Sequence, residues 1–236
     1  MKKLDILDSG FIRLVDMMGN DDRVLDAARV STGASSKGKK EDAGLINYLM
    51  ENRHHTPFEK IVFEFHIKCP IFIARQWFRH RIGSFNEMSS RYREFEFEVY
   101  MPTTWRGPGT TNHQGSISGV FDKDEELELK YILLKQYTSA QESYRKLLEK
   151  GVAKELARLI IPMAQYTEFY WTVNMRSLMN FLSLRDDDHA QFEIREYAKG
   201  IKRMIESTNK IPMTLKAFER FGYSGLKDSL CKCHGS

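Results

Sequence analysis

Cysteine is scarce in this chain of 236 residues, which contains Cys69, Cys231 and Cys233. An odd, low number argues against a scaffold held together by disulfides and fits a reducing compartment. Cys69 is expected to be a small buried residue. Cys231, Cys233 and His234 could form a fragment of a metal site, but three ligands crowded near one chain end support it weakly, and no metal is expected.

Long apolar runs are also lacking. No stretch approaches the ~20 apolar residues of a membrane-spanning helix. Lys2 and Lys3 are followed by Asp5 and Asp8, which interrupt the apolar run that a signal peptide needs. The sequence therefore predicts a soluble, cytoplasmic protein. The net charge of +4, from 36 basic and 32 acidic residues, is mild and neither requires nor excludes nucleic acid as a partner.

Several common nucleotide and hydrolase motifs are absent. The sequence has no G-x-G-x-x-G turn, no P-loop and no G-x-S-x-G nucleophile motif. A dinucleotide, if one binds, is therefore not held by a Rossmann turn.

Apolar residues that alternate with polar ones predict strands, and apolar residues at helical spacing predict helices. The predicted strands cover residues 10–19, 61–69, 94–99 and 165–173. The predicted helices cover 21–29, 45–50, 71–80, 122–150, 153–161, 176–184 and a stretch from the cap at 186–188 past 205, with a last short helix after Pro212. The segments 32–42 and 102–120 are predicted to be loops because Gly, Ser, Thr and Pro are frequent there.

Helices that lie between alternating strands favour an α+β fold with a mainly antiparallel sheet covered on one face. No internal repeat and no clear linker divides the chain. We therefore expect one domain over residues 1–236, with a mobile loop at 102–120 and a flexible tail after about residue 223.

Arginines are concentrated in residues 75–92. If this segment begins as a helix, Gln76, Arg79 and His80 lie at i, i+3 and i+4 and share one face. Guanidinium groups match phosphate oxygens well, so converging arginines suggest a phosphorylated ligand. From charge alone, a solvated basic face with ordinary ion pairs is the simpler interpretation.

The order of motifs is more specific than the charge. Arg79-His80-Arg81 is followed after seven residues by Ser89, with Asn86-Glu87 before it and Arg91-Tyr92 after it. Four further blocks have the same relative order as in the flavin-dependent thymidylate synthases, which the chain resembles over residues about 10–200. These blocks are His54-His55-Thr56-Pro57-Phe58-Glu59, Ala74-Arg75-Gln76-Trp77, Ala157 to Pro162, and Trp171 to Leu182 followed by Arg185 and His189.

This resemblance implies a methyltransferase and flavoprotein of dTMP biosynthesis. It implies that dUMP is methylated at C5 with a carbon from methylenetetrahydrofolate, while FAD relays a hydride from NADPH. It also implies a homotetramer with shared sites. The implied FAD ligands are Thr56, Arg79, His80, Arg81, Glu87, Asn174, Arg176, Asn180 and His189. The implied dUMP ligands are Gln76, Arg79, Glu87, Met88, Ser89, Ser90, Arg91, Arg158 and Arg185, and the implied catalytic residue is Arg185.

Residue chemistry adds to this picture. Arg176, Asn180 and Leu184 are spaced four apart and form one helical stripe, which suits a flavin but is also typical of a surface helix. Ser89 is not expected to be a nucleophile, because no base is evident for its hydroxyl. His66 is expected to be structural. The loop at 102–120 and the tail after Pro212 have no evident counterpart in the family.

Two other functions remain open from sequence. Arginines and aromatic residues near 77–92 could grip single-stranded nucleic acid, which would require no cofactor. A folate-dependent flavoenzyme could instead methylate uracil in RNA, but a net charge of +4 does not suggest the broad basic surface that RNA would need.

Overall fold

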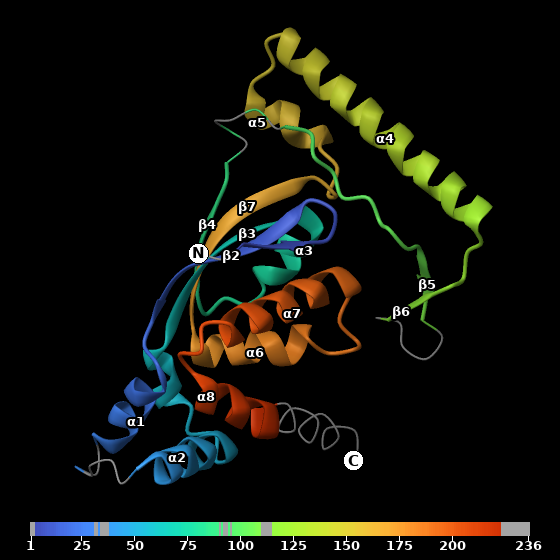
Figure 1. Ribbon diagram of the computed structural model, residues 1–236. Coiled ribbons are helices and arrows are strands. Elements are labelled where there is room, and N and C mark those ends of the chain that lie inside the picture. Colours follow the sequence, from blue (N-terminus) through green and yellow to red (C-terminus); the bar gives the residue numbers. More distant parts are fainter. Residues whose placement is uncertain are drawn as a thin grey trace, which may run out of the picture.

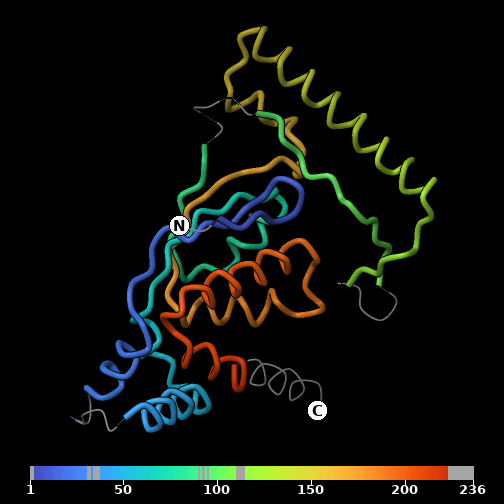
Figure 2. Tube along the Cα trace, in the orientation of Figure 1, coloured from blue at the N-terminus to red at the C-terminus, as the bar shows by residue number. Residues whose placement is uncertain are grey.

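A five-stranded antiparallel sheet is the centre of the structure, a computed structural model that describes residues 3–30, 33, 38–89, 91, 94, 96–109 and 115–222. Figures 1 and 2 show the sheet above a group of helices, with a helical arm projecting from it. The elements in chain order are β1 (Lys3–Ile6), β2 (Gly10–Met18), α1 (Asp21–Arg29), α2 (Lys39–Glu51), η1 (Thr56–Lys60), β3 (Val62–Pro70), α3 (Ile71–Trp77), β4 (Ser84–Glu87), β5 (Arg106–Pro108), β6 (Ser116–Ser118), α4 (Lys123–Glu149), α5 (Lys154–Ala157), η2 (Arg158–Ile160), β7 (Tyr166–Asn174), α6 (Met175–Arg185), α7 (Phe192–Glu206), α8 (Pro212–Ala217) and η3 (Phe218–Gly222).

The strands are ordered β1-β2-β3-β7-β4, and each neighbouring pair is antiparallel. Strands β3 and β7 pair along their whole length, with Phe65 opposite Trp171 and His66 opposite Tyr170. Because side chains alternate along a strand, the first pair points into the core while the second pair points to the polar face. The prediction of an α+β fold with a mainly antiparallel sheet is confirmed.

Helices α3, α6 and α7 cover the apolar face of the sheet (Figure 1). The centre of this core is an aromatic group in which the Trp77 ring lies 4.8 Å from Phe181 and 5.4 Å from Trp171, measured between centroids. All three side chains are fully buried. Because α3 and α6 are fixed to the sheet through this group, the polar residues at their ends are held in place as well.

The arm consists of α4, α5 and η2 (Figure 1). Tyr144 is the one buried residue of α4. Apolar side chains are instead exposed along this helix, and Leu127 and Tyr131 are 64% and 66% exposed. Among the helices of the described part, none combines the length and apolar character needed to cross a membrane.

The strands predicted at 10–19, 61–69 and 165–173 are confirmed as β2, β3 and β7. The strand predicted at 94–99 is wrong, because in the described part of that segment only Val99 forms a bridge, to Gln165. The short strands β1 and β4 were not predicted, since four residues carry too little alternation to be recognised.

The helix cap predicted at 186–188 is wrong, whereas α1 begins at Asp21 as predicted. Asn20 caps α1 by accepting a hydrogen bond from the Arg23 amide at 3.1 Å. The Asp21 carboxylate is buried and accepts the Met213 and Thr214 amides at the start of α8. Helix α7 begins at Phe192 with Gln191 as its cap, so the acidic run 186–188 does not cap it.

Both predicted loops contain regular structure. In the segment 32–42, α2 begins at Lys39, where acidic residues in the first turn stabilise the helix start. The segment 102–120 contains the hairpin of β5 and β6. Residues 110–114, and the tail after 222 with Cys231, Cys233 and His234, lie outside the described residues.

Candidate active site

Helix α6 positions several of the predicted site residues. Its cap is Asn174, whose side-chain oxygen accepts the Ser177 amide at 2.9 Å. Arg176 and Asn180 are exposed on one side, while Leu178, Phe181 and Leu182 are buried on the other. The predicted stripe of Arg176, Asn180 and Leu184 is confirmed as the exposed side of this helix.

The C-terminal end of α6 brings Arg185 to the end of α3. Its Nε donates to Nε2 of His80 at 3.1 Å, and its Nη2 donates to the backbone carbonyl of Gln76 at 3.3 Å. Three of the predicted nucleotide and flavin residues therefore meet, although they come from segments more than a hundred residues apart.

The predicted helical face of Gln76, Arg79 and His80 is wrong, because α3 ends at Trp77. His80 reaches Arg185 from the turn after the helix, where its amide donates to the carbonyl of Trp77 at 3.0 Å. Arg79 and Arg81 are exposed on either side of it. In this turn the imidazole of His80 is therefore half-buried, whereas the guanidinium groups of Arg79 and Arg81 face solvent.

His80 is a neutral acceptor at this site. Burial, and then the positive charge of Arg185, lower the pKa of His80 from 6.5 to about 4. Because Nε2 accepts from Arg185, the ring proton belongs on Nδ1. Burial also lowers the pKa of Arg185, but a guanidinium stays charged at neutral pH.

Behind this site lies a group of polar residues that sequence reasoning missed. The side chain of Gln76 donates to Gln191, Gln191 donates to Glu193, and Glu193 is paired with Arg106 of β5. One signal was available for Glu193: it occupies the buried apolar stripe of α7, where a carboxylate requires a partner.

The N-terminal end of α6 forms a second cluster of hydrogen-bond donors. Arg176 pairs with Glu59 at 2.6 Å, and the exposed Thr56 begins the neighbouring η1. Burial, followed by the charges of Arg176, Arg53 and His54, lowers the pKa of His55. Guanidinium, hydroxyl and amide donors that face outward around an exposed helix stripe fit the diphosphate and ring edge of a flavin.

Strand β4 carries the next group of predicted nucleotide ligands. The Glu87 carboxylate accepts the Thr167 hydroxyl at 2.8 Å, and the Met88 amide donates to the carbonyl of Glu168 at 2.9 Å. The Ser89 hydroxyl accepts the Arg91 amide at 3.4 Å. Pairing of β4 with β7 therefore fixes the position of Glu87, at the start of the segment that contains the predicted nucleotide ligands. Ser90 lies outside the described residues.

Arg158 lies in the arm and not at the end of α6, where Arg185, His80 and Gln76 meet. It is exposed at the start of η2 and donates to the carbonyl of Glu155 at 3.2 Å. This segment directly follows α5 in the arm, well away from α6 (Figure 1).

His189 lies beyond the end of α6, where its Nδ1 contacts Asp187 at 2.7 Å. It lines a cavity of about 590 Å³ together with Arg106, Gln191 and Arg195. Gln191 lines this cavity and also accepts the hydrogen bond from Gln76, so His189 and Gln76 both lie near Gln191.

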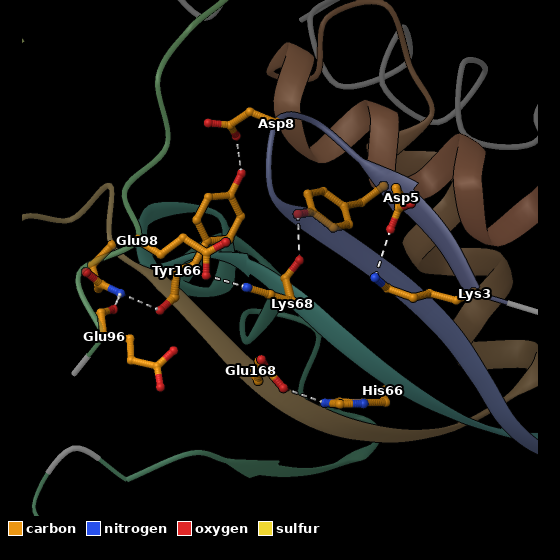
Figure 3. A network of polar contacts seen from close by, with 11 residues as sticks. Lys3, Asp5, Asp8, His66, Lys68, Glu96, Glu98, Tyr166 and Glu168 are labelled. Atoms are coloured by element: carbon orange, nitrogen blue, oxygen red, sulfur yellow. Dashed lines mark hydrogen bonds and ion pairs between the residues drawn. The ribbon is translucent and has the colours of Figure 1, made fainter. Parts of the chain in front are cut away.

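The polar face of the sheet holds another network near the start of β7 (Figure 3). His66 contacts Glu168 at 2.9 Å and Arg13 at 3.0 Å, and its ring stacks on Tyr170. Lys68 pairs with Glu98. Both ring nitrogens of His66 are engaged within the sheet, which supports the predicted structural role.

No cluster with the composition of a metal site is present among the residues that the structure describes. Cys69 is buried at the end of β3, as predicted. Burial raises the pKa of its thiol well above the ordinary value, so it is not a reactive thiolate.

Comparisons with known proteins identify the family to which this chain belongs. The family described as "Thymidylate synthase complementing protein" matches residues 13–209. The chain is 52% identical over 224 residues to a flavin-dependent thymidylate synthase of Thermosipho melanesiensis, covering 93% of this chain and 95% of the relative. It is 47% identical over 216 residues to one of Thermus thermophilus, covering 92% of this chain and 78% of the relative.

A solved structure is similar over nearly the same length. A UMP/dUMP methylase, PolB, from Streptomyces cacaoi, bound with 5-Br UMP, has a TM-score of 0.82 at 36% identity. The match covers 93% of this chain and 98% of that one. A structure of the same methylase bound with 5-Br dUMP has a TM-score of 0.83.

Proposed function

Because the chain belongs to the flavin-dependent thymidylate synthase family, we propose that it converts dUMP to dTMP, with methylenetetrahydrofolate as the carbon donor and NADPH as the source of reducing equivalents. The observation that carries the proposal is the junction of Arg185, His80 and Gln76 at the ends of two packed helices. Relatives that are about half identical over most of this chain are named flavin-dependent thymidylate synthases, which supports the proposal.

Arg185 supplies the activation of the pyrimidine. C5 of uracil becomes a better nucleophile when N3 loses its proton and the ring gains negative charge. A guanidinium beside N3 and O2 favours that anion, because an opposite charge stabilises the charged form. His80 is neutral and accepts from Arg185 Nε, so it orients the guanidinium without competing for the anion.

Flavin is proposed to lie along the exposed stripe of α6. When bound, it supplies the hydride that reduces the transferred carbon to a methyl group. Arg176 offers a guanidinium and Asn180 an amide to it, and burial lowers the pKa of His55 next to Thr56, which disfavours a further cation there. The complete proposed set is Thr56, Arg79, His80, Arg81, Glu87, Asn174, Arg176, Asn180 and His189.

The nucleotide phosphate is proposed to bind where β4 ends. Ser89 and Arg91 lie next to each other there, and the exposed Arg79 follows α3. Hydroxyl and guanidinium donors bind phosphate without any nucleophilic role. The complete proposed set is Gln76, Arg79, Glu87, Met88, Ser89, Ser90, Arg91, Arg158 and Arg185.

A homotetramer would explain why two proposed dUMP ligands, Arg158 and Arg185, lie in different parts of the chain. Arg158 lies in the arm, whereas Arg185 lies at the end of α6 (Figure 1). The arm also carries exposed apolar side chains, including Leu156 and Leu159 at 56% and 78% exposure. A second copy of this chain would bury that surface and bring its own Arg158 to the site.

Complementation tests the shared site. Arg79→Ala and Arg158→Ala proteins should each be inactive, and mixing them under conditions of subunit exchange should restore part of the activity. A fully active monomer in light scattering would contradict the assembly.

The function itself is tested with purified protein. We expect a yellow protein that releases FAD on denaturation and forms dTMP from dUMP, methylenetetrahydrofolate and NADPH, with each component omitted in turn. UMP is the comparison substrate, because PolB is described as a UMP/dUMP methylase. Colourless protein that FAD cannot reconstitute, or methyl transfer only to RNA, would reject the proposal. Steeply salt-dependent binding of single-stranded nucleic acid without flavin would favour the nucleic-acid alternative.

A further inference from the structure

A continuous chain of hydrogen bonds runs from the β5–β6 hairpin to the proposed nucleotide site. Glu193 is 2% exposed at the start of α7 and accepts from three donors. Tyr100 donates at 3.0 Å, Gln191 donates through Nε2 at 2.9 Å, and Arg106 pairs with the same carboxylate. A carboxylate paired with a guanidinium only accepts hydrogen bonds.

Arg106 is itself held firmly. Its Nε donates to the Ser116 hydroxyl at 3.1 Å, and its guanidinium carbon lies 4.9 Å from the centre of the Phe192 ring. The carboxylate of Glu193 is therefore held in one position in the protein interior, where it can only accept hydrogen bonds.

Because Glu193 only accepts hydrogen bonds, it determines how the side-chain amides of Gln191 and Gln76 are oriented. Gln191 must turn its NH2 group toward Glu193, which leaves its Oε1 facing Gln76. Gln76 must then turn its own NH2 group toward Gln191. If the Gln76 amide were flipped, two carbonyl oxygens would face each other, which is repulsive. The carbonyl oxygen of Gln76 consequently points away from the network.

The same residue connects to the catalytic candidate through its backbone, since the Gln76 carbonyl accepts from Arg185 Nη2 at 3.3 Å. We propose that Glu193 is a positioning residue which, through Gln191, fixes the side-chain amide of Gln76 so that its oxygen points out of the network and meets a donor of the nucleotide, while the backbone carbonyl of Gln76 holds Arg185.

This inference rests on the proposed function, because Gln76 contacts substrate only if dUMP is the ligand. The donors that dUMP offers are the ring N3–H and the 3′-hydroxyl. Two analogues separate them: N3-methyl dUMP lacks the first donor, and 2′,3′-dideoxyuridine monophosphate lacks the second.

The test measures the Kd of dUMP and of both analogues by calorimetry, using flavin-loaded parent protein and two variants. Glu193→Gln replaces the pure acceptor with a group that can also donate, so both amides can flip. Gln191→Leu interrupts the chain while leaving Glu193 with Arg106 and Tyr100. Glu196→Gln is the matched control, because Glu196 lies on the same helix and pairs with Lys199 at 3.0 Å.

Both variants should raise the Kd of dUMP about tenfold, the usual weight of one well-placed hydrogen bond, while the control keeps the parent value. One of the two analogues lacks the donor that faces Gln76, and its Kd should be the same for the parent and for both variants. Simple destabilisation of the fold would instead weaken the binding of dUMP and of both analogues. If Glu193→Gln fails to fold, Gln191→Leu decides the question.

Parent-like Kd values in folded, flavin-loaded variants would overturn the inference, as would an equal loss for dUMP and both analogues. Failure of the parent to bind dUMP is a different result. It would reject the proposed function and, with it, this role of Glu193.

Discussion

Nε of Arg185 and Nε2 of His80 are 3.1 Å apart, although the two residues are separated by 105 positions in the sequence. Their contact joins the end of α6 to the turn after α3. Both elements pack through the aromatic rings of Trp77 and Phe181. The His80 ring also packs on Phe181, with 4.9 Å between the ring centroids. The apolar core thus fixes a polar contact at its rim.

This contact should make stability depend on pH. The pKa of His80 is about 4 in the folded chain and 6.5 in a model peptide, so between these values the unfolded state binds a proton that the folded state does not. The contribution of His80 is therefore fully present above 6.5 and is lost as the pH falls through about 4.

His80→Gln keeps an acceptor for Arg185 but does not titrate. Urea unfolding measured on both sides of that range should show a smaller loss of stability at low pH for the variant than for the parent. His55 and the carboxylates are present in both proteins, so their contributions to the pH dependence of the free energy of unfolding cancel in the comparison. Identical pH dependence would mean that His80 is protonated normally in the folded state.

Much of the fold follows from local patterns, and the site does so only in part. Alternation along β3 and β7 and the apolar stripe of α6 were sufficient to predict those elements, because one face of each is buried. The end of α3 was not predicted: the helix ends at Trp77, which is fully buried, and neither Gly nor Pro follows it within five residues to mark the end in the sequence. Glu193 and Arg106 are 87 positions apart, and no local pattern connects such a pair.

Gly83 should tolerate no side chain. An added Cβ would lie 2.9 Å from the carbonyl oxygen of Thr172 and 2.9 Å from Nε1 of Trp171. Since Gly83 directly precedes β4, relief of this clash would shift Ser84 from its partner Thr172 on β7. Gly83→Ala should destabilise the fold by about 1–3 kcal/mol and weaken dUMP binding, as seen in urea unfolding and calorimetry.

Gly44→Ala is the control for this substitution. Gly44 lies in α2, and nothing lies within 4 Å of its added Cβ. Alanine should stabilise this helix by about 0.5–1 kcal/mol. If Gly83→Ala behaves like Gly44→Ala, β4 can shift without cost.

Ser89→Ala should keep measurable methylation. The Ser89 hydroxyl accepts the Arg91 amide at 3.4 Å and is proposed to contact phosphate. Loss of one such contact costs about 1–3 kcal/mol and not the whole rate, because the backbone and neighbouring guanidinium groups remain. The measurement is the steady-state rate of dTMP formation at several dUMP concentrations. A trapped covalent adduct between Ser89 and the pyrimidine, detected by mass spectrometry, would show that the serine is a nucleophile after all.

Arg185→Ala provides the most direct test of the chemistry. The variant should fold and stay yellow, because Arg185 lies at the end of α6 and the core residues Phe181 and Leu182 are unchanged. It should lose C5 methylation at saturating dUMP by about 3–4 kcal/mol of barrier, the usual weight of one preorganised donor to a developing charge.

Arg185→Lys separates charge from geometry. A lysine keeps the positive charge but lacks the planar fork that donates to His80 and to the Gln76 carbonyl at once. It should therefore recover only part of the rate. Asp186→Asn is the control for a merely structural role: if Arg185 served chiefly to pair with the acidic run that follows it, this variant would lose activity as well. Parent-like methylation by Arg185→Ala would instead assign pyrimidine activation to another cation, and Arg176 would be the next to test, because it lies on the same helix beside the proposed flavin.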